Sequence, residues 1–219
     1  MRRSVFDHES AYRGRDVSSI SGVPIVICGA GAIGSQVAEA IVRQWGVLNL
    51  TVIDHDRVEQ HNIGNQIYRE PDVGRLKTAA LADHLFDILG IEVQQVSSRL
   101  DGPMVRRWRR KGQVVVDCFD NSESRRLVAH HCDGLLIPCL HLGVAADYGE
   151  VIWNDRYRVP TDAPPAAAAA APCHIPLART IIALTATVGA EVLARYLLDG
   201  VQEDYTITLG DFQIRRSNA

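Results

Sequence analysis

The sequence has 219 residues, 47% of them hydrophobic, and a formal net charge of −3 at pH 7 from 23 Lys and Arg against 26 Asp and Glu. A chain of this length and composition can bury one substantial core, so we expect a single domain over residues 1–219. The charge balance lacks the basic surplus that nucleic-acid-binding proteins show, which argues against nucleic acid as a partner.

Residues 1–22 form a polar N-terminal leader. Its two arginines are not followed by an apolar segment, so we expect no signal peptide and a cytoplasmic protein. The cysteines at positions 28, 118, 132, 139 and 173 form no C-x-x-C pair, which favours reduced thiols and predicts no structural zinc. Cys28 and Cys118 lie in apolar strand patterns and should be small core residues.

The stretch Ile25–Gly34, IVICGAGAIG, is an apolar strand that runs into a glycine-spaced turn, and a helical pattern follows to about Trp45. This is the context that the dinucleotide-binding motif G-x-G-x-x-G requires. We expect Gly29 to permit the tight turn, Gly31 to let the backbone approach a phosphate, and Gly34 to let the helix pack closely on the strand. The helix N-terminus would attract the anion.

Polar side chains follow the next apolar runs. Asp54 ends the run LTVID twenty residues past the last glycine, where a carboxylate can bind ribose hydroxyls, and Lys77 starts a helical pattern after a polar loop. Asp117, Asp120 and Asn121 lie at the end of the run VVVDCFDN. The carboxyl ends of parallel strands line one crevice, so Asp54, Lys77 and Asp120 should converge.

Apolar runs alternate with helical patterns as far as LIPCLHLGV, which predicts a doubly wound, Rossmann-like α/β fold with a mostly parallel sheet and helices on both faces. GEVIWNDRYRV is typical of an edge or antiparallel strand, and YTITLGDFQI of two short strands that close the sheet. Residues 160–176, rich in alanine and proline, are expected to form a mobile crossover loop. The apolar segment that follows contains Arg179, Glu191 and Arg195, so we expect a buried or dimer-facing helix and no membrane span.

The polar residues favour ATP over a nicotinamide cofactor. None of the eight histidines is singled out as the proton relay that hydride transfer needs. A carboxylate that faces a triphosphate requires a divalent cation between them, and Mg²⁺ suits carboxylate and phosphate oxygens. Nearby lysine and arginine side chains would offset charge on a departing pyrophosphate. The combination predicts attack on the α-phosphate of ATP.

Four motifs occur in order between about Pro24 and Trp153: GAGAIG, DHDRVEQHNIGNQ, GRLK and DCFDNSESR. With them the sequence resembles the ThiF/MoeB/HesA family, bacterial relatives of ubiquitin-activating enzymes that adenylate the C-terminal glycine carboxylate of ubiquitin-like proteins. The resemblance implies the adenylation fold of those enzymes and an ATP- and Mg²⁺-dependent adenylyltransferase. It also implies a ubiquitin-like or sulfur-carrier partner that ends in glycine, and a homodimer.

The resemblance further implies roles for individual residues. Asp54 would bind the ATP ribose and Asp56 would support the loop beside it; Asn62, Gln66 and Lys77 would contact the phosphates; Asp120 would hold Mg²⁺ and Asn121 would shape that loop. Two structural alternatives stay open. Asp120 could cap a strand end, Lys77 could be a solvated charge, and Asp117 is expected to be a local hydrogen-bond acceptor.

The sequence departs from the family pattern at Asn65, where the pattern has an arginine before the glutamine. Either Arg69 or Arg75 replaces that cation, or adenylation is weak. The family also uses an N-terminal arginine that reaches into the partner subunit's site. Arg13 and Arg15 both qualify, and for each of them a surface arginine without a role fits as well.

Cys173 follows the crossover segment beside a histidine. Relatives place near here a cysteine that forms a thioester or acyl-disulfide with the activated partner, while a thiol that packs the loop is the alternative. Three other functions remain open. The same ATP chemistry could act on a peptide or tRNA carboxylate, the chain could be a non-catalytic module that docks a ubiquitin-like protein, or the glycine motif alone could belong to a nicotinamide oxidoreductase.

Overall fold

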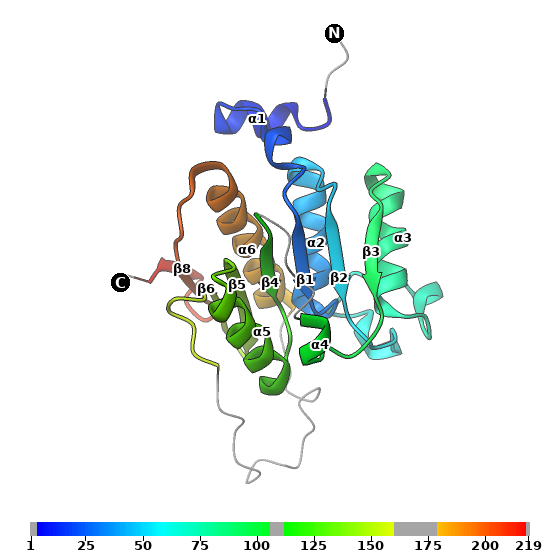
Figure 1. The fold of residues 1–219 in the computed structure, drawn as a ribbon. Coiled ribbons are helices and arrows are strands. Elements are labelled where there is room, and N and C mark those ends of the chain that lie inside the picture. Colours follow the sequence, from blue (N-terminus) through cyan, green and yellow to red (C-terminus); the bar gives the residue numbers. More distant parts are fainter. Residues whose placement is uncertain (1–3, 106–111, 160–178, 218–219) are drawn as a thin grey trace.

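A computed structural model describes residues 4–105, 112–159 and 179–217. They form one eight-stranded sheet with strand order β3-β2-β1-β4-β5-β6-β7-β8 (Figure 1). The strands are β1 (Ile25–Cys28), β2 (Leu50–Ile53), β3 (Val93–Val96), β4 (Val114–Asp117), β5 (Cys139–Ala145), β6 (Tyr148–Trp153), β7 (Tyr205–Thr208) and β8 (Gln213–Arg216). The first five in spatial order are parallel and the last three pair antiparallel, which confirms the predicted fold class.

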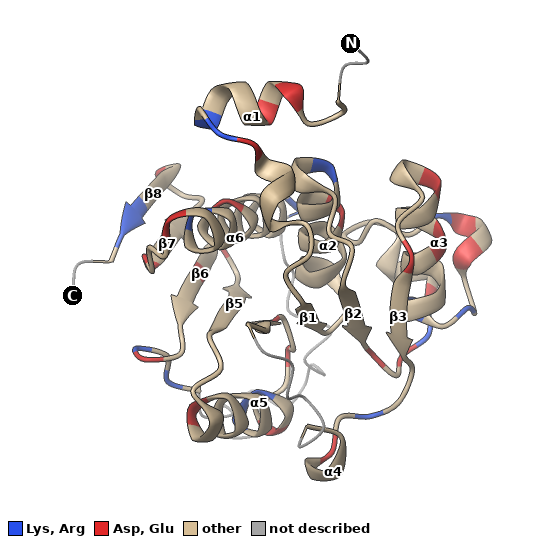
Figure 2. Ribbon diagram, turned by 45° about the horizontal axis from the view of Figure 1, so that its top comes forward, with Lys and Arg blue, Asp and Glu red and all other residues tan. Residues whose placement is uncertain are grey.

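Helices cover both faces of the sheet. They are α1 (Asp7–Arg13), α2 (Ala32–Trp45), α3 (Lys77–Leu89), α4 (Gly102–Val105), α5 (Ser122–Leu135) and α6 (Arg179–Asp199), with short 3-10 helices at Val17–Ile20, Gln60–Asn62 and Glu70–Asp72. Buried residues of α2, α3 and α6 share one apolar cluster, and those of α4 and α5 share another. Figure 2 shows α5 and α4 on the face opposite α2 and α6.

The central strands bring three chain segments to one edge of the sheet. All four residues of β1 and of β4 are buried, as expected for parallel strands covered on both faces. Cys28, the last residue of β1, is level with Ile53 on one side and with Asp117 on the other. The loops after β1, β2 and β4 therefore leave the sheet together.

The C-terminal part follows the prediction. β6 lies antiparallel between β5 and β7, so it is an interior strand and not an edge. β7 and β8 form the expected hairpin that closes the sheet. The predicted crossover loop at 160–176 lies outside the described residues.

α6 is long and apolar enough to cross a membrane, and half of its most apolar window is buried inside this chain. It packs against α2, β5, β6 and β7. A Cβ on Gly189 would lie 2.2 Å from Leu142 Cδ2, so the helix backbone approaches β5 closely. These contacts agree with the expected buried helix.

The polar leader contributes to the core. Val17 and Ile20 are buried, and Asp16 caps their 3-10 helix by accepting from Ser18 N–H. α1, which precedes it, buries none of its residues and lies beyond the amino ends of the parallel strands (Figure 1).

Candidate nucleotide-binding site

The glycine loop joins β1 to α2, and its three glycines have different surroundings. Gly29 has φ +95°, and a Cβ there would lie 3.1 Å from Cys118 O. A Cβ on Gly34 would lie 1.9 Å from Gly29 O, so only glycine lets α2 pack against the turn. Gly31, at the N-cap of α2, has open space, since no described heavy atom lies within 4 Å of its Cβ position. A ligand can approach the backbone there.

Asp54 is held against the glycine loop. Ala30 N–H donates to its Oδ2 at 2.7 Å, and Asp56 N–H donates to its Oδ1 at 2.8 Å. The residue is buried at the carboxyl end of β2. Each carboxylate oxygen has a second lone pair, so the group can still accept hydrogen bonds from ligand hydroxyls.

Lys77 begins α3, and it is buried with 8% relative exposure. Its Nζ lies 3.0 Å from Asp56 Oδ2, and its backbone N–H donates to Asp56 O at 2.9 Å. The ammonium group is therefore fixed next to the Asp54 loop, which differs from a freely solvated charge. The Asp56 side chain is about half exposed, at 52%.

Tyr68, which the sequence analysis did not single out, ties the polar loop to the glycine loop. Its hydroxyl donates to Ala30 O at 2.6 Å. Burial and the nearby charges of Asp54 and Asp72 raise the pKa of Tyr68 well above its usual value, so the phenol stays protonated and remains a donor.

Asn62 and Gln66 precede Tyr68 in the same loop, and both are buried. Asn62 Oδ1 accepts from Glu59 N–H at 2.8 Å and so stabilises the 3-10 turn. Gln66 Oε1 and Asn65 Oδ1 are buried without a hydrogen-bond partner in the described structure. A phosphate accepts hydrogen bonds, so Asn62 and Gln66 would contact it through their side-chain NH₂ groups.

Arg69 and Arg75, the two candidates to replace the missing family cation, are both paired with acidic side chains. Both guanidinium groups bind Asp72, at 3.5 Å and 3.1 Å, and Arg75 also pairs with Asp83. No contact of either with the glycine loop occurs among the described residues.

The loop after β4 carries Asp120 and Asn121. Asn121 caps α5 by accepting from Ser124 N–H at 2.8 Å, which fits its predicted role in shaping the loop. Asp120 is exposed. Asp117 is fully buried; it accepts from Phe119 N–H at 3.1 Å and contacts His141 Nδ1 at 2.9 Å, as expected for a local acceptor.

Arg125, the last residue of the fourth motif, binds the loop after β4 through its side chain. It donates to Phe119 O at 2.5 Å, to Leu142 O at 2.8 Å and to the Tyr157 hydroxyl at 2.7 Å. The Tyr157 ring stacks on His141 with 3.7 Å between ring centroids. This buried network fixes the backbone beside Asp120, and sequence reasoning missed both of its aromatic members.

Among the described residues, the one cluster of at least three His, Cys, Asp or Glu side chains close enough together to hold a metal ion consists of Asp54, His55 and Asp56. Asp120, the predicted Mg²⁺ ligand, is not part of it. The described cysteines, at 28, 118, 132 and 139, are buried and free. Burial raises the pKa of the Cys28 thiol well above its usual value, which fits its predicted core role. Cys173 lies outside the described residues.

Arg13 and Arg15 are engaged within their own chain. Arg13 pairs with Glu191 at 2.5 Å and donates to Glu9 at 2.8 Å, and Arg15 pairs with Asp199 at 2.9 Å. Arg13 is the last residue of α1 and Arg15 lies two residues beyond it, and α1 lies at the amino ends of the parallel strands, away from the nucleotide loops (Figure 1).

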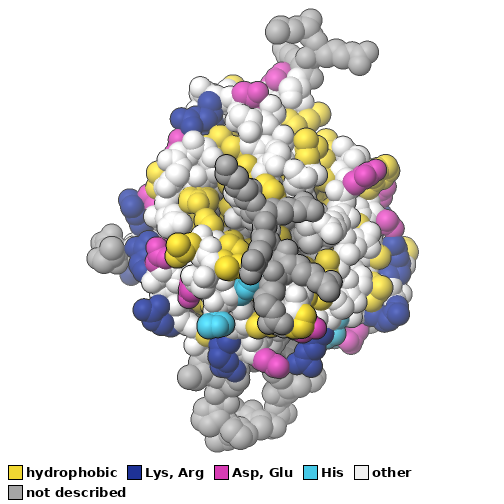
Figure 3. Space-filling model, in the orientation of Figure 1, with side chains coloured by type: hydrophobic (Ala, Val, Ile, Leu, Met, Phe, Trp, Pro, Cys, Tyr) yellow, Lys and Arg dark blue, Asp and Glu magenta, His cyan; other side chains and the backbone are white. Residues whose placement is uncertain are grey.

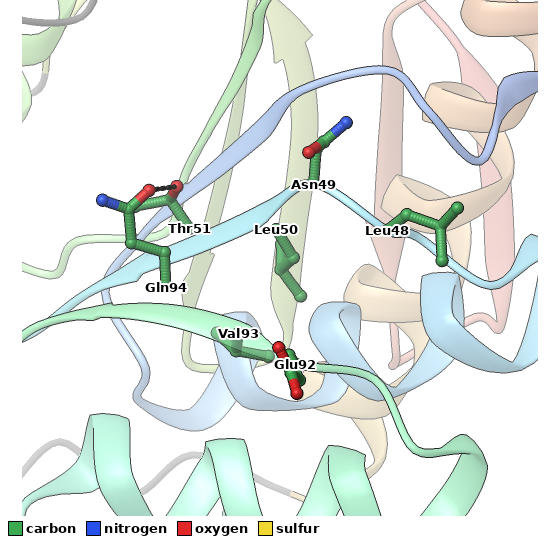
Figure 4. A pocket seen from close by; sticks show the side chains of 7 residues that line it. All are labelled: Leu48, Asn49, Leu50, Thr51, Glu92, Val93 and Gln94. Atoms are coloured by element: carbon green, nitrogen blue, oxygen red, sulfur yellow. Dashed lines mark hydrogen bonds between the residues drawn. The ribbon is translucent and has the colours of Figure 1, made fainter.

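The structure also has a groove of about 370 Å³ at the other end of the sheet (Figure 4). It is lined by residues 48–51 and 92–94, at the amino ends of β2 and β3. The candidate nucleotide-binding site lies at the carboxyl ends of the strands, so the groove and the candidate site are separate. On the face in Figure 3, basic and acidic side chains are interspersed around the rim of the described surface, and they form no continuous basic area there.

Residues 9–213 match the ThiF family. The sulfur carrier protein ThiS adenylyltransferase of Bacillus subtilis is 32% identical over 128 residues, which are 57% of this chain and 38% of that protein. The SAMP-activating enzyme E1 of Haloferax volcanii is 31% identical over 119 residues, or 53% of this chain and 44% of that protein. The chain thus spans less than half the length of these curated relatives.

Solved structures share the fold. Escherichia coli MccB crystallised with ATP superposes with a TM-score of 0.78 at 16% identity, covering 99% of this chain and 72% of that one. MccB with its SeMet MccA gives a TM-score of 0.77, covering 100% of this chain and 72% of that one. At this identity the likeness concerns the fold. Because the family match covers nearly all of the sequence, the chain belongs to the ThiF family.

Proposed function

We propose that this protein adenylates the C-terminal carboxylate of a ubiquitin-like or sulfur-carrier protein with ATP and Mg²⁺. The observation that carries the proposal is the position of the Asp54 carboxylate. The Asp54 carboxylate accepts from Ala30 N–H in the glycine loop and from Asp56 N–H, and the Asp56 side chain pairs with Lys77. The glycine loop and the Asp54 loop both lie at the carboxyl ends of adjacent parallel strands. This arrangement offers a ribose acceptor next to a phosphate-binding helix end and a buried cation.

Each nucleotide part has a proposed site. Asp54 accepts from the ribose hydroxyls, and Asp56 orients Lys77 toward the phosphates. The phosphates lie over Gly31 and the start of α2, where space is open and backbone N–H groups are directed outward. Asn62 and Gln66 contact the phosphates through their side-chain NH₂ groups, and Asn62 Oδ1 also stabilises the turn.

Mg²⁺ fits the chemistry of Asp120. Asp120 is exposed in a loop whose Cys118 and Phe119 lie against Gly29, and Asn121 and Arg125 stabilise that loop through hydrogen bonds. Mg²⁺ is commonly bound by one or two carboxylates together with phosphate oxygens, and one carboxylate is what this loop supplies. When bound, the ion would neutralise charge on the phosphates.

In the reaction, a carboxylate oxygen of the partner attacks the α-phosphate, and the bond between the α-phosphorus and the bridging oxygen breaks. The products are an acyl-adenylate and pyrophosphate, and no proton needs to move. The protein's contribution is to position the two reactants and to offset negative charge through Lys77. The names of the relatives that act on ThiS and on SAMP support a protein acceptor.

The remaining parts of the proposal concern the assembly. The protein would be a cytoplasmic homodimer in which Arg13 or Arg15 enters the partner subunit's site, and Cys173 would accept the activated acyl group as a thioester. Arg13 would have to exchange Glu191 for the nucleotide, whereas the more exposed Arg15 pairs only at the surface. Solved complexes of MccB with MccA make a peptide acceptor the main alternative, ahead of a tRNA carboxylate.

The test is ATP–pyrophosphate exchange with candidate partners that end in Gly-Gly. Exchange should require the partner and should be lost in Asp120→Ala and Lys77→Ala. Absence of both exchange and ATP binding would contradict the proposal and favour a non-catalytic module that docks the partner. Exchange that persists in Asp120→Ala would overturn the Mg²⁺ assignment. A partner adduct absent from Cys173→Ser would support the thioester, and full transfer activity in that variant would contradict it.

A further inference from the structure

Arg179, the first residue of α6, reaches across to the polar loop of the candidate site. Its Nη1 lies 3.2 Å from Gly64 O and 3.5 Å from Gln66 O. The residue itself is exposed. Its guanidinium group therefore lies beside Asn65, the position at which the family pattern has an arginine.

The Gly64–Gln66 turn is attached to the phosphate-binding end of α2. Gln36, in the second turn of that helix, donates from Nε2 to Asn65 O at 3.3 Å. Two residues farther on, Tyr68 donates to Ala30 O in the glycine loop. Arg179 thus contacts a turn that lies against the start of α2, where an anion is favoured.

Most of the described cations near that point are paired with carboxylates. Asp54, Asp56 and the exposed Asp120 supply three carboxylates, and a triphosphate adds further negative charge. Lys77 is paired with Asp56, and Arg69 and Arg75 with Asp72, whereas Arg57, like Arg179, binds only backbone carbonyl oxygen among the described residues. Like charges without compensation would disfavour the bound nucleotide.

The guanidinium group of Arg179 has N–H donors that it does not use in the described structure. A guanidinium group has five N–H donors, and both hydrogen bonds of Arg179 in the described structure are made through Nη1. Gln66 Oε1 and Asn65 Oδ1, in the same turn, are buried without a described partner. The unused N–H donors of Arg179 are therefore the groups that could bind a phosphate here.

We propose that Arg179 binds a phosphate group of the nucleotide and supplies from α6 the cation that is absent at position 65. This inference rests on the proposed function. The alternative is that Arg179 only stabilises the Gly64–Gln66 turn by binding its carbonyl oxygens.

Titration of the full chain with Mg-ATP and, separately, with adenosine distinguishes the two. A charged hydrogen bond contributes enough that Arg179→Ala should weaken ATP binding about 10- to 100-fold and leave adenosine binding unchanged. Arg179→Lys, which keeps the charge but not the planar fork, should be intermediate. Adding Asn65→Arg to Arg179→Ala should restore part of the ATP affinity. Arg215→Ala on β8 is the matched control, because Arg215 is an exposed arginine paired only with Asp211 and Gln213.

Two results would overturn the inference alone. One is wild-type ATP affinity in Arg179→Ala; the other is an equal loss of ATP and adenosine binding, which would mean that Arg179 only holds the turn. A wild-type chain that does not bind Mg-ATP would contradict the proposed function and this inference together. The comparison of wild type with Arg179→Ala therefore separates the two failures.

Discussion

Gly31 and Gly34 are three residues apart in one motif, yet alanine should affect them in different ways. At Gly34 the new Cβ would lie 1.9 Å from Gly29 O, a backbone atom that cannot move without distorting the turn. Overpacking of this kind costs roughly 1–3 kcal/mol or more. For a chain of about 200 residues that lowers Tm by roughly 2–4 °C for each kcal/mol.

Gly31→Ala meets no described atom within 4 Å, but its backbone, at φ −80° and ψ −148°, lies outside the helical and β regions that L-residues prefer. We therefore expect a backbone cost of about 1 kcal/mol, which should lower Tm by roughly 2–4 °C, less than the clash at Gly34. The methyl group would occupy the space where a phosphate approaches the backbone. Mg-ATP binding should consequently fall by at least about tenfold, the equivalent of one charged hydrogen bond.

The assay is thermal unfolding of both variants with and without Mg-ATP, with Gly22→Ala as a control whose Cβ also has open space. Gly34→Ala should have the lower unfolding temperature of the two variants without ligand, and Gly31→Ala, with its smaller loss of stability, should also lose the shift that ligand produces. The reasoning is refuted if Gly31→Ala retains the full ligand-induced shift, or if both variants lose the same stability without ligand.

Three further predictions concern the residues that support the site. Tyr68→Phe leaves Ala30 O without its donor and should cost about 1–3 kcal/mol in urea unfolding, with weaker ATP binding; unchanged values for both would contradict the role of the hydroxyl. Arg125→Ala removes three hydrogen bonds and leaves the Asp117 charge less compensated, so about 3–5 kcal/mol of stability should be lost, and a loss below about 1 kcal/mol would argue against it. Burial raises the pKa of the Glu150 carboxyl, although the charges of Arg125 and His141 oppose the shift. The folded state therefore keeps the Glu150 proton to a higher pH than the unfolded state does. As the pH rises through the raised pKa, the Glu150 charge destabilises the folded state. Glu150→Gln should therefore raise Tm at pH 8 and change it little at pH 4. An increase in Tm at pH 4 but not at pH 8 would contradict this prediction.

The sequence predicted those parts of the site that depend on local spacing. Gly29, Gly31 and Gly34 belong to one turn, and Asp54 ends the next strand, so their relative positions follow from strand–turn–helix geometry. Parallel pairing then brings the loop after β4 to the same edge, as the register of Cys28 with Ile53 and Asp117 shows.

Contacts between distant segments could not be predicted in this way. Tyr68 bonds to Ala30 across 38 positions, and Arg179 reaches Gly64 across 115. No local pattern encodes such pairs, because they depend on how the polar loop and α6 fold back over the sheet. Asn62 shows a different limit: the motif predicted a phosphate contact for it, but not the hydrogen bond that its Oδ1 accepts from Glu59 N–H within the turn.

The central claim is that the site activates a carboxylate with ATP. Intact-mass analysis of a Gly-Gly-terminated partner, after incubation with the protein and Mg-ATP, tests this most directly. The account predicts an AMP adduct at the partner's C-terminal carboxylate, formed with equimolar pyrophosphate and absent with Lys77→Ala or with a partner lacking its last glycine. Contradiction would come from bound ATP that is never cleaved, or from cleavage that releases ADP and phosphate without an adduct on any partner.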